Sequence, residues 1–290
     1  MKDVLLLGNG INNLSKNRIT WDELLNDIVN LCDNTISIKK KKLPILYEES
    51  FLKAAKLIGK SEKTLKEEIA KLIGSIEHNS IHEKLLQLNV FDIITTNYDH
   101  TLQNYLIKNG KYFTNENKSE NEFNIFRFNE ISGKRFWHIH GDISKPKSIV
   151  LGFDFYCRQT HKIEDYLKTK YDGKFLIPFI ERYNENLITN DSWIDLFFTA
   201  NIHIVGLGLG FEETDLWWLL TQRARLKIDK KLKPDNKIFY YEPIGFTNQV
   251  KTDMFKAVEV EVRQFHSIDD AYYIEVIDHI KSQLSYKGYL

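Results

Sequence analysis

Two histidines stand two residues apart in the segment Trp137-His138-Ile139-His140-Gly141-Asp142. If this segment is a strand, the alternation of side chains places both histidines on one face. Two histidines at this spacing could ligate a metal, although no third ligand is apparent nearby. A histidine at a strand end, just before a glycine, is also well placed to act as an acid or a base. The alternative is a histidine bound to a backbone carbonyl, which suits His138 better than His140.

A second polar group follows an apolar run in the segment Ile93-Ile94-Thr95-Thr96-Asn97-Tyr98-Asp99. The carboxyl end of a parallel strand is where such sheets place residues that contact a ligand. The alternative is that Asp99 or Asn97 only caps the following helix. Capping explains one polar residue here, whereas four of them beside two isoleucines favour a binding role.

Two glycine-rich turns follow apolar runs, at Leu7-Gly8-Asn9-Gly10-Ile11-Asn12 and at Gly206-Leu207-Gly208-Leu209-Gly210-Phe211. Such turns can bring bare backbone amides close to a phosphate. The complete dinucleotide fingerprint needs a third glycine where this chain has Asn13, and no acidic ribose ligand is apparent on a second strand. The alternative is tight turning or close backbone packing. Two such turns that frame two polar strand ends favour a nucleotide cleft.

The elements that must position these segments alternate between strands and helices, which predicts an α/β, Rossmann-like fold with a mainly parallel sheet flanked by helices. Residues 111–124 are polar and are predicted to form a loop. The pair Trp217-Trp218 is predicted to belong to the core or to an oligomer interface. The apolar runs that predict strands are residues 3–7, 91–95, 135–139, 148–151, 201–207, 237–241 and 258–262.

No strand-like run lies between Leu31 and Val90, so residues 33–89 are predicted to be a helical insertion within a single domain of residues 1–290. Its helices are expected at 47–58, 62–73 and 81–88. We expect Ser61 to cap the second helix, and Ser80 with Glu83 to form a capping box at the third. Before the insertion, Thr20 and Glu23 form the same pattern at a helix that begins near Trp21.

The composition is that of a globular protein with 290 residues and a formal net charge of zero, which disfavours nucleic-acid binding through bulk charge. Cys32 and Cys157 lie far apart and form no metal-spaced pair, which favours a reducing, cytoplasmic location. No apolar run reaches the roughly 18 residues of a membrane span, and the apolar start is too short for a signal peptide core.

The order of the four segments resembles the sirtuin-like (SIR2-like) domain, and its bacterial antiphage-defence branch in particular, where the middle segment also reads Thr-Thr-Asn-Tyr-Asp. The resemblance spans about residues 3 to 265. Deacylase sirtuins carry a zinc module with two Cys-x-x-Cys pairs, whereas residues 145–200 of this chain contain only Cys157. The resemblance therefore implies a domain without a zinc module or another metal, in which NAD+ itself is cleaved.

The resemblance implies roles for the residues at matching positions. Asn97 corresponds to the catalytic asparagine that orients the nicotinamide ribose and the attacking water. Asp99 corresponds to the aspartate near the nicotinamide carboxamide, and His140 to the catalytic base. Asn12 stands where sirtuins have serine. The positions expected to contact NAD+ are Gly8, Asn9, Gly10 and Asn12 at the first turn, Thr96, and Gly206, Gly208 and Leu209 at the second turn.

The implied activity is hydrolysis of NAD+ to nicotinamide and ADP-ribose by an NAD-depleting effector of abortive infection. Two alternatives stay open: a non-catalytic module that senses NAD+ or ADP-ribose, and a zinc-free protein deacylase. We expect activation by homo-oligomerisation, by a separately encoded defence partner or by a phage trigger. Contact with membranes or directly with nucleic acid is not expected.

Overall fold

The computed structural model describes residues 1–32, 36, 44–74, 76–110, 113–116, 122–170 and 177–286, and these form an eight-stranded sheet. Six neighbouring strands run parallel in the order β5-β2-β1-β6-β7-β8, and β3 and β4 extend one edge antiparallel. The strands are β1 Lys2–Leu7, β2 Asp92–Thr95, β3 Phe113–Glu116, β4 Asn129–Ile131, β5 Lys134–His138, β6 Ala200–Val205, β7 Ile238–Pro243 and β8 Val260–Phe265.

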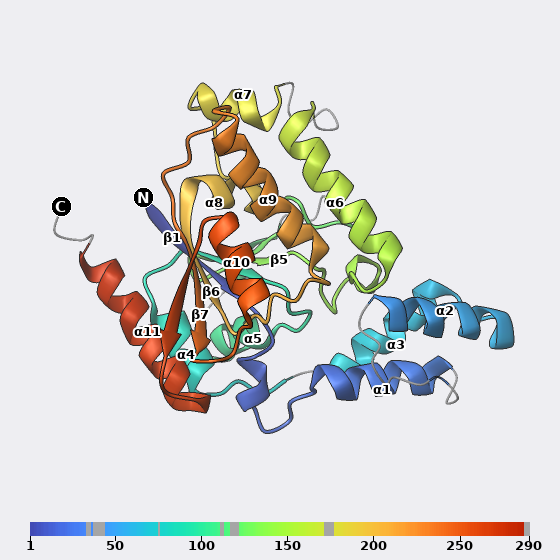
Figure 1. The fold of residues 1–290 in the computed structure, drawn as a ribbon. Helices are drawn as coiled ribbons and strands as arrows, with labels where there is room; N and C mark the ends of the chain where they lie inside the picture. The colour runs from blue at the N-terminus through green and yellow to red at the C-terminus, as the bar shows by residue number, and fades with distance from the viewer. Residues whose placement is uncertain are drawn as a thin grey trace.

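Helices cover both faces of this sheet, which confirms the predicted α/β, Rossmann-like class (Figure 1). The strands in its centre are buried on both sides, as their nearly continuous apolar sequence requires. One face packs against α6 Phe153–Lys168, α7 Phe179–Asn184, α8 Trp193–Thr199, α9 Thr214–Ile228 and α10 Gln249–Ala257. The other face packs against α4 Ser80–Gln87, α5 Thr101–Lys108 and α11 Asp269–Tyr286.

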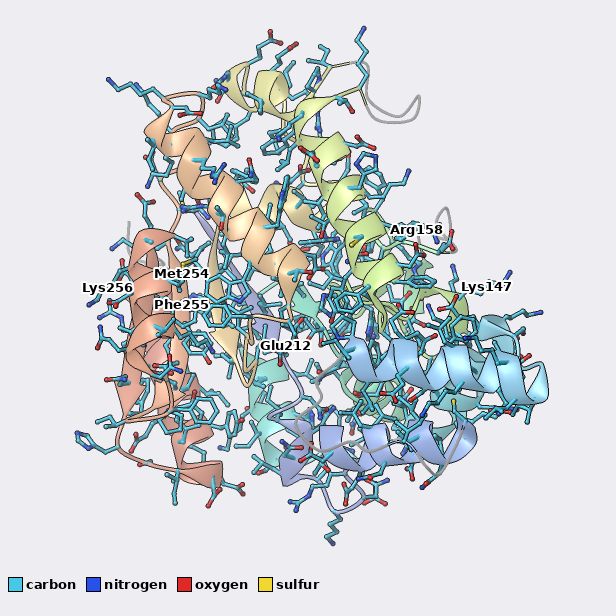
Figure 2. The ribbon with its side chains drawn as sticks, turned by 45° about the vertical axis from the view of Figure 1, so that its right-hand side comes forward. Lys147, Arg158, Glu212, Met254, Phe255 and Lys256 are labelled. Atoms are coloured by element: carbon cyan, nitrogen blue, oxygen red, sulfur yellow. The ribbon has the colours of Figure 1, made fainter. Side chains whose placement is uncertain are left out.

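Helix α10 shows how one residue anchors a helix to this core. Phe255 is buried against the rings of Tyr240 and Trp217, whereas its neighbour Lys256 is exposed (Figure 2). No helix among the described residues combines the length and the apolar character needed to cross a membrane.

The edge of the sheet differs from the predicted loop at residues 111–124. Residues 113–116 form β3, which pairs with β4, while residues 111–112 and 117–121 lie outside the described part of the chain. Strand β4 was not anticipated, and a hairpin joins it to β5 through Ser132 and Gly133. Both turn residues have positive φ (54° and 73°), which suits the twist of a two-residue hairpin.

The strand predicted at residues 148–151 is wrong, because Pro146–Ser148 is a 3-10 turn and the buried residues after it pair with no strand. Side chains satisfy its buried carbonyl groups instead. The ammonium group of Lys66 donates to the Ile149 carbonyl (2.7 Å), and the Tyr98 hydroxyl donates to the Val150 carbonyl (2.8 Å). An apolar run can therefore be buried without a sheet when polar side chains reach its backbone.

The predicted insertion contains two different packing environments. Helices α2 Ile45–Ile58 and α3 Glu62–Ile73 pack with α1 Trp21–Cys32 around a separate apolar cluster, and Figure 1 shows these three helices together beside the sheet. Helix α4, by contrast, belongs to the helical cover of the sheet and contacts α11 and α5. The lysine run at 39–42 lies outside the described residues.

The helix caps confirm two of the three predicted start sites. The Thr20 hydroxyl accepts from the Glu23 amide while the Glu23 carboxylate accepts from the Thr20 amide, and the Ser61 hydroxyl accepts from the Thr64 amide. The capping box predicted at Ser80 and Glu83 is wrong, since Asn79 caps α4 with His82 as its partner. The Asn79 amide also donates to the Ile11 carbonyl and the Ser15 hydroxyl, both at 3.0 Å.

We expect Asn79→Ala to lower the free energy of unfolding by about 1–2 kcal/mol, because the helix loses its cap and two further hydrogen bonds. The matched control Ser80→Ala removes an exposed side chain and is expected to change it by less than about 0.5 kcal/mol. Urea denaturation of both variants measures the difference. Equal losses would contradict the assignment of Asn79 as the cap.

Candidate functional site

A cleft of about 860 Å³ opens where the carboxyl ends of β1, β2, β6 and β7 meet. This is the edge at which open parallel sheets bind ligands, and the volume lies within the range of roughly 300–1,000 Å³ typical of ligand pockets. Among the predicted site residues, those that line the cleft are Asn9, Gly10, Thr96, His140, Gly206, Gly208 and Leu209.

The two glycine turns press directly against each other at one wall of this cleft. The Gly8 amide donates to the Val205 carbonyl (3.1 Å), and the Gly10 amide donates to the Gly206 carbonyl (2.8 Å). A Cβ atom at Gly8 would lie 2.4 Å from the Cα of Leu207, and one at Gly10 would lie 2.7 Å from the Gly206 carbonyl oxygen. Close backbone packing therefore explains these two glycines. At Gly208 a Cβ would meet no atom within 4 Å, so a side chain would have room there, while the Gly208 carbonyl accepts from Lys251 and from the Tyr240 hydroxyl.

Four predicted site residues are not among those that line the cleft: Gly8, Asn12, Asn97 and Asp99. The Asn97 side chain is half-buried, and its amide donates to the Gly8 carbonyl (3.3 Å). The side-chain amide of Asn12 donates through Nδ2 to the Asp99 carboxylate (2.8 Å). Its side-chain oxygen, Oδ1, contacts Nε2 of His82 (3.0 Å). The structure thus joins Asn12 to Asp99.

Asp99 makes two contacts, one with the start of the following helix and one with the first glycine turn. Its Oδ1 accepts from the backbone amide of Thr101 (3.0 Å), the first residue of α5, as a helix-start residue does. Its Oδ2 receives the bond from Asn12, which ties the end of β2 to the first glycine turn. One carboxylate therefore braces two of the segments that form the site.

His138 has the structural role expected for it. Its Nδ1 contacts the Asn97 carbonyl (2.8 Å), and its Nε2 contacts Gln103. Burial lowers the pKa of His138 to about 4, so the ring is neutral at physiological pH. The contact with a backbone carbonyl confirms the alternative reading for this histidine, and it fixes the backbone at Asn97.

His140 lines the cleft and stands between two carboxylates, although only 2% of it is exposed. Its Nε2 lies 3.0 Å from Oδ2 of Asp215, and its Nδ1 lies 3.6 Å from Oε2 of Glu213. Burial by itself disfavours the charged ring, but Asp215 and Glu213 outweigh it and raise the pKa of His140 to about 9. The histidine is therefore an imidazolium at neutral pH in the unliganded protein.

Comparison with known proteins accounts for this arrangement of segments. Residues 92–179, which include Asn97 and His140, match the family model described as the SIR2-like domain. The chain is also 26% identical over 237 residues to "Defense-associated sirtuin 2" from Bacillus subtilis, an alignment that covers 71% of this chain. The central segment of the chain, residues 92–179, is SIR2-like. The chain spans 20% of the length of that relative.

Two carboxylates that sequence reasoning missed stand beside His140. Glu213 and Asp215 stand two residues apart just after the second glycine turn, where the sequence pattern indicated only the start of a helix. Their spacing at a strand-to-helix junction was the available signal. What the sequence does not show is that β5 and β6, which are separated in the sheet by two strands, bring His140 and Asp215 together.

Within the described residues, His140, Glu213 and Asp215 also form the group whose ligand atoms lie close enough, within 4.8 Å, to share a metal ion. The two carboxylates, however, face opposite nitrogens of the same ring. One ion bound to one ring nitrogen could not replace both contacts. The geometry is that of an ion-paired histidine.

A third residue that the sequence motifs did not indicate is Glu242, which places a carboxylate at the cleft. It stands at the carboxyl end of β7, lines the cleft and is 1% exposed. Its Oε1 accepts from the Thr247 hydroxyl (2.6 Å) and the Gln264 amide (2.9 Å). Its Oε2 is buried without a hydrogen-bond partner among the described residues. A buried carboxylate oxygen without a partner, on a residue that lines a cleft, is a candidate acceptor for a ligand hydroxyl.

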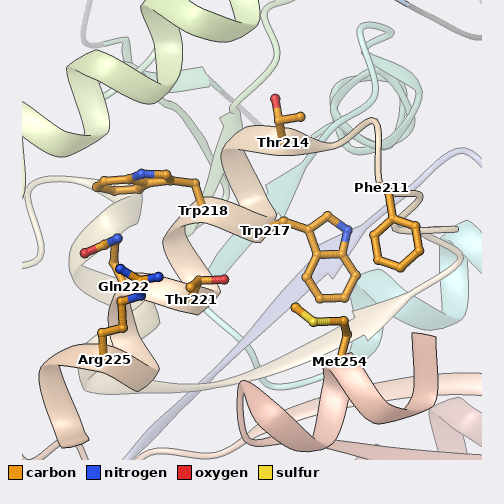
Figure 3. Close-up of a pocket in the computed structure, with 8 residues that line it drawn as sticks. All are labelled: Phe211, Thr214, Trp217, Trp218, Thr221, Gln222, Arg225 and Met254. Carbon is orange, nitrogen blue, oxygen red and sulfur yellow. The ribbon is translucent and has the colours of Figure 1, made fainter. Parts of the chain in front are cut away.

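The two tryptophans at 217–218 line a separate, shallower hollow of about 410 Å³ on the outer side of α9 (Figure 3). Trp217 is buried, and its indole nitrogen donates to the Gly210 carbonyl (2.9 Å), so it anchors the second glycine turn. The prediction that Trp217 belongs to the core is confirmed. Figure 3 shows Met254 of α10 beside the Trp217 ring.

Gly141 follows His140 directly and adopts a backbone conformation that favours glycine. Its φ is +89°, and a Cβ atom there would lie 2.1 Å from the Ser148 carbonyl oxygen. We expect Gly141→Ala to lower the free energy of unfolding by about 3 kcal/mol, since backbone strain and overlap add.

The matched control is Gly133→Ala, which also has positive φ but would meet no atom within 4 Å. Its expected cost is about 1 kcal/mol, from the backbone conformation alone. Thermal and urea denaturation measure both variants. A loss at Gly141 no larger than that at Gly133 would show that the overlap relaxes without cost.

Proposed function

We propose that this SIR2-like domain hydrolyses NAD+ to nicotinamide and ADP-ribose. The observation that carries the proposal is the position of His140, which lines a cleft bounded by two glycine turns and is held by a pair of carboxylates. The volume of the cleft suits a dinucleotide, and Gly206 and Gly208 line it, where a backbone amide could approach a pyrophosphate.

The residues of the chain have complementary tasks in such a reaction. Nicotinamide leaves as a neutral molecule, so the protein must mainly position the ribose, stabilise developing positive charge and deliver a water. Glu212 and Glu213 place negative charge along the cleft, on the loop that precedes α9 (Figure 2 labels Glu212). Only the deprotonated ring of His140, which forms as the pH approaches and passes its pKa of about 9, would take the proton from the water or a ribose hydroxyl. Asn97 would orient that ribose and water.

A role in antiphage defence is supported by the similarity to a defence-associated sirtuin. We propose that NAD+ cleavage serves abortive infection, with assembly of copies of this chain, a defence partner or a phage component as the trigger. Nicotinamide release measured over a range of protein concentrations separates self-assembly from the other triggers. Specific activity that rises with concentration supports self-assembly.

The assigned site is tested by incubation of the purified protein with NAD+ and chromatographic measurement of nicotinamide. We expect Asn97→Ala and His140→Ala each to lower the rate by at least about 100-fold, because positioning or proton transfer is lost. The control His161→Ala removes a histidine whose side chain is 69% exposed and should leave the rate unchanged. Activity that survives both site variants would exclude this assignment.

The same assay separates the alternatives. A deacylase would release nicotinamide only with an acylated peptide, whereas a glycohydrolase needs none. A sensor would bind NAD+ in calorimetry and release no nicotinamide at any protein concentration. The peptide requirement and the binding measurement therefore assign the chain to one of three activities.

We expect Oε2 of Glu242, which has no hydrogen-bond partner among the described residues, to make the cleft prefer NAD+ over NADP+. A carboxylate that accepts from an adenosine-ribose hydroxyl would repel the 2′-phosphate of NADP+. We expect kcat/KM for NAD+ to exceed that for NADP+ by about tenfold or more. Glu242→Gln should narrow this ratio, and Glu261→Gln, a change at a half-exposed side chain on β8, should not. An unchanged ratio in Glu242→Gln would remove Glu242 from the adenosine end.

A further inference from the structure

The two carboxylates beside His140 differ in their access to the cleft. Asp215 is 0% exposed and lies on the inner side of the ring, at Nε2. Glu213 lines the cleft, retains 17% exposure of its side chain and faces Nδ1. The ring therefore presents Nδ1 on the cleft side and keeps Nε2 against the protein interior.

Asp215 is held on three sides, which makes it a rigid partner. Its Oδ1 accepts from the Leu216 amide (2.9 Å), and its Oδ2 accepts from the side-chain amide of Gln159 (3.2 Å) as well as facing His140. Gln159 is itself fixed, since its amide donates to the Ile139 carbonyl (2.7 Å). Asp215 also stands in the first turn of α9, where the helix dipole favours an anion.

Asp215 remains ionised in this setting. Burial opposes its charge, but His140, the Leu216 amide and Gln159 outweigh burial and hold the pKa of Asp215 below its usual range. An ionised carboxylate can only accept a hydrogen bond, so the proton of the contact sits on Nε2 of His140. When the ring is neutral, the nitrogen without a proton is then Nδ1, which faces the cleft.

Glu213 acts on the other side of the ring. Burial raises the pKa of Glu213 to about 7, with His140 opposing and Asp215 and Glu212 adding to the rise. The charged and titratable groups around the ring are Asp215 of α9, Glu213 of the preceding loop and Tyr156 of α6, whose ring centre lies 5.6 Å from that of His140. Lys251 of α10 and Tyr98 interact electrostatically with Glu213.

We propose that Asp215 and Glu213 are positioning residues of His140 with separate tasks. Asp215 fixes the ring so that Nδ1 faces the cleft, and Glu213 sets the pH above which that nitrogen can accept a proton. The inference rests on the proposed hydrolysis of NAD+. In that reaction the oxygen of water bonds to C1′ of the ribose while the bond from C1′ to the nicotinamide nitrogen breaks. The bonding pair stays on nicotinamide, and the water proton passes to Nδ1 and then to solvent.

The kinetic test compares the pH dependence of kcat and kcat/KM in Asp215→Asn, Glu213→Gln and the wild type. Glu213→Gln removes one negative charge from beside the His140 ring. The acid limb of its pH profile should therefore move to lower pH, while the plateau of kcat stays within about twofold of the wild-type value. Asp215→Asn should lower the plateau itself, by roughly 10²–10⁴-fold, because the ring loses its orientation and tautomer. Asp229→Asn, an exposed change at the far end of α9, is the control and should reproduce the wild-type profile.

A second measurement determines the pKa and the tautomer of His140 independently of catalytic activity. In protein labelled with ¹⁵N-histidine, NMR titration gives the pKa and the tautomer of His140, with the resonance assigned by its loss in His140→Gln. We expect Glu213→Gln to lower that pKa and keep the proton on Nε2. Asp215→Asn should lose the Nε2 preference, and Glu213→Gln carries the test alone if Asp215→Asn does not fold.

The outcomes separate the two proposals. If His140 responds as expected and no form of the protein releases nicotinamide, the hydrolysis is wrong and the carboxylates still order the ring. If nicotinamide is released while the pKa of His140 is the same in Glu213→Gln and wild type, the inference about Glu213 is overturned. A wild-type plateau of kcat in folded Asp215→Asn overturns the inference about Asp215.

Discussion

The contact between the two glycine turns is the constraint on which the site depends. Strands β1 and β6 are neighbours in the sheet, and their turns continue the pairing beyond the strand ends through the bond from Gly10 to Gly206. Any side chain at Gly8 or Gly10 would overlap backbone atoms of the other turn. Because the turns interlock, the wall of the cleft is set by main-chain packing and needs little from the side chains.

The protonation state of His140 depends on the two carboxylates beside its ring. A buried histidine would ordinarily be neutral, as His138 is, yet Asp215 and Glu213 make His140 a cation. Two histidines that stand two residues apart in one segment thus have pKa values on opposite sides of neutral pH, about 4 for His138 and about 9 for His140. His140 faces Glu213 of the loop before α9 and Asp215 of its first turn, whereas burial and the neighbouring His100 keep the pKa of His138 low.

Much of the fold could be predicted from sequence because its signals are local. The apolar runs of the parallel strands and the caps at Thr20 and Ser61 depend on neighbouring residues alone. The strand predicted at 148–151 failed because an apolar run does not reveal that Lys66 and Tyr98 reach its carbonyls. At α4 the cap was displaced by one residue, since Ser80 and Asn79 are equally good cap types and only the contacts of Asn79 with the first turn distinguish them.

The site was predicted in its segments and missed in its partners. The motifs indicated which strand ends meet. Glu213, Asp215 and Glu242 could be assigned to the site only from the folded structure, in which the sheet brings them to His140 or to the cleft. Glu242 was missed because nothing near it in sequence marks a carboxylate that will be buried with one oxygen free. Long-range pairing of charges is the information that a single sequence lacks.

The cap of α4 also links the first glycine turn, at the edge of the cleft, to the helical layer formed by α4, α5 and α11. Asn79 holds the first glycine turn through Ile11 and Ser15, and His82 of the same capping box contacts Asn12, which in turn bonds to Asp99. A molecule that orders the first glycine turn is therefore expected also to stabilise the first turn of α4, which packs in the same apolar cluster as Ile11. Ligand affinity and the local stability of that helix are two measures of one hydrogen-bond network.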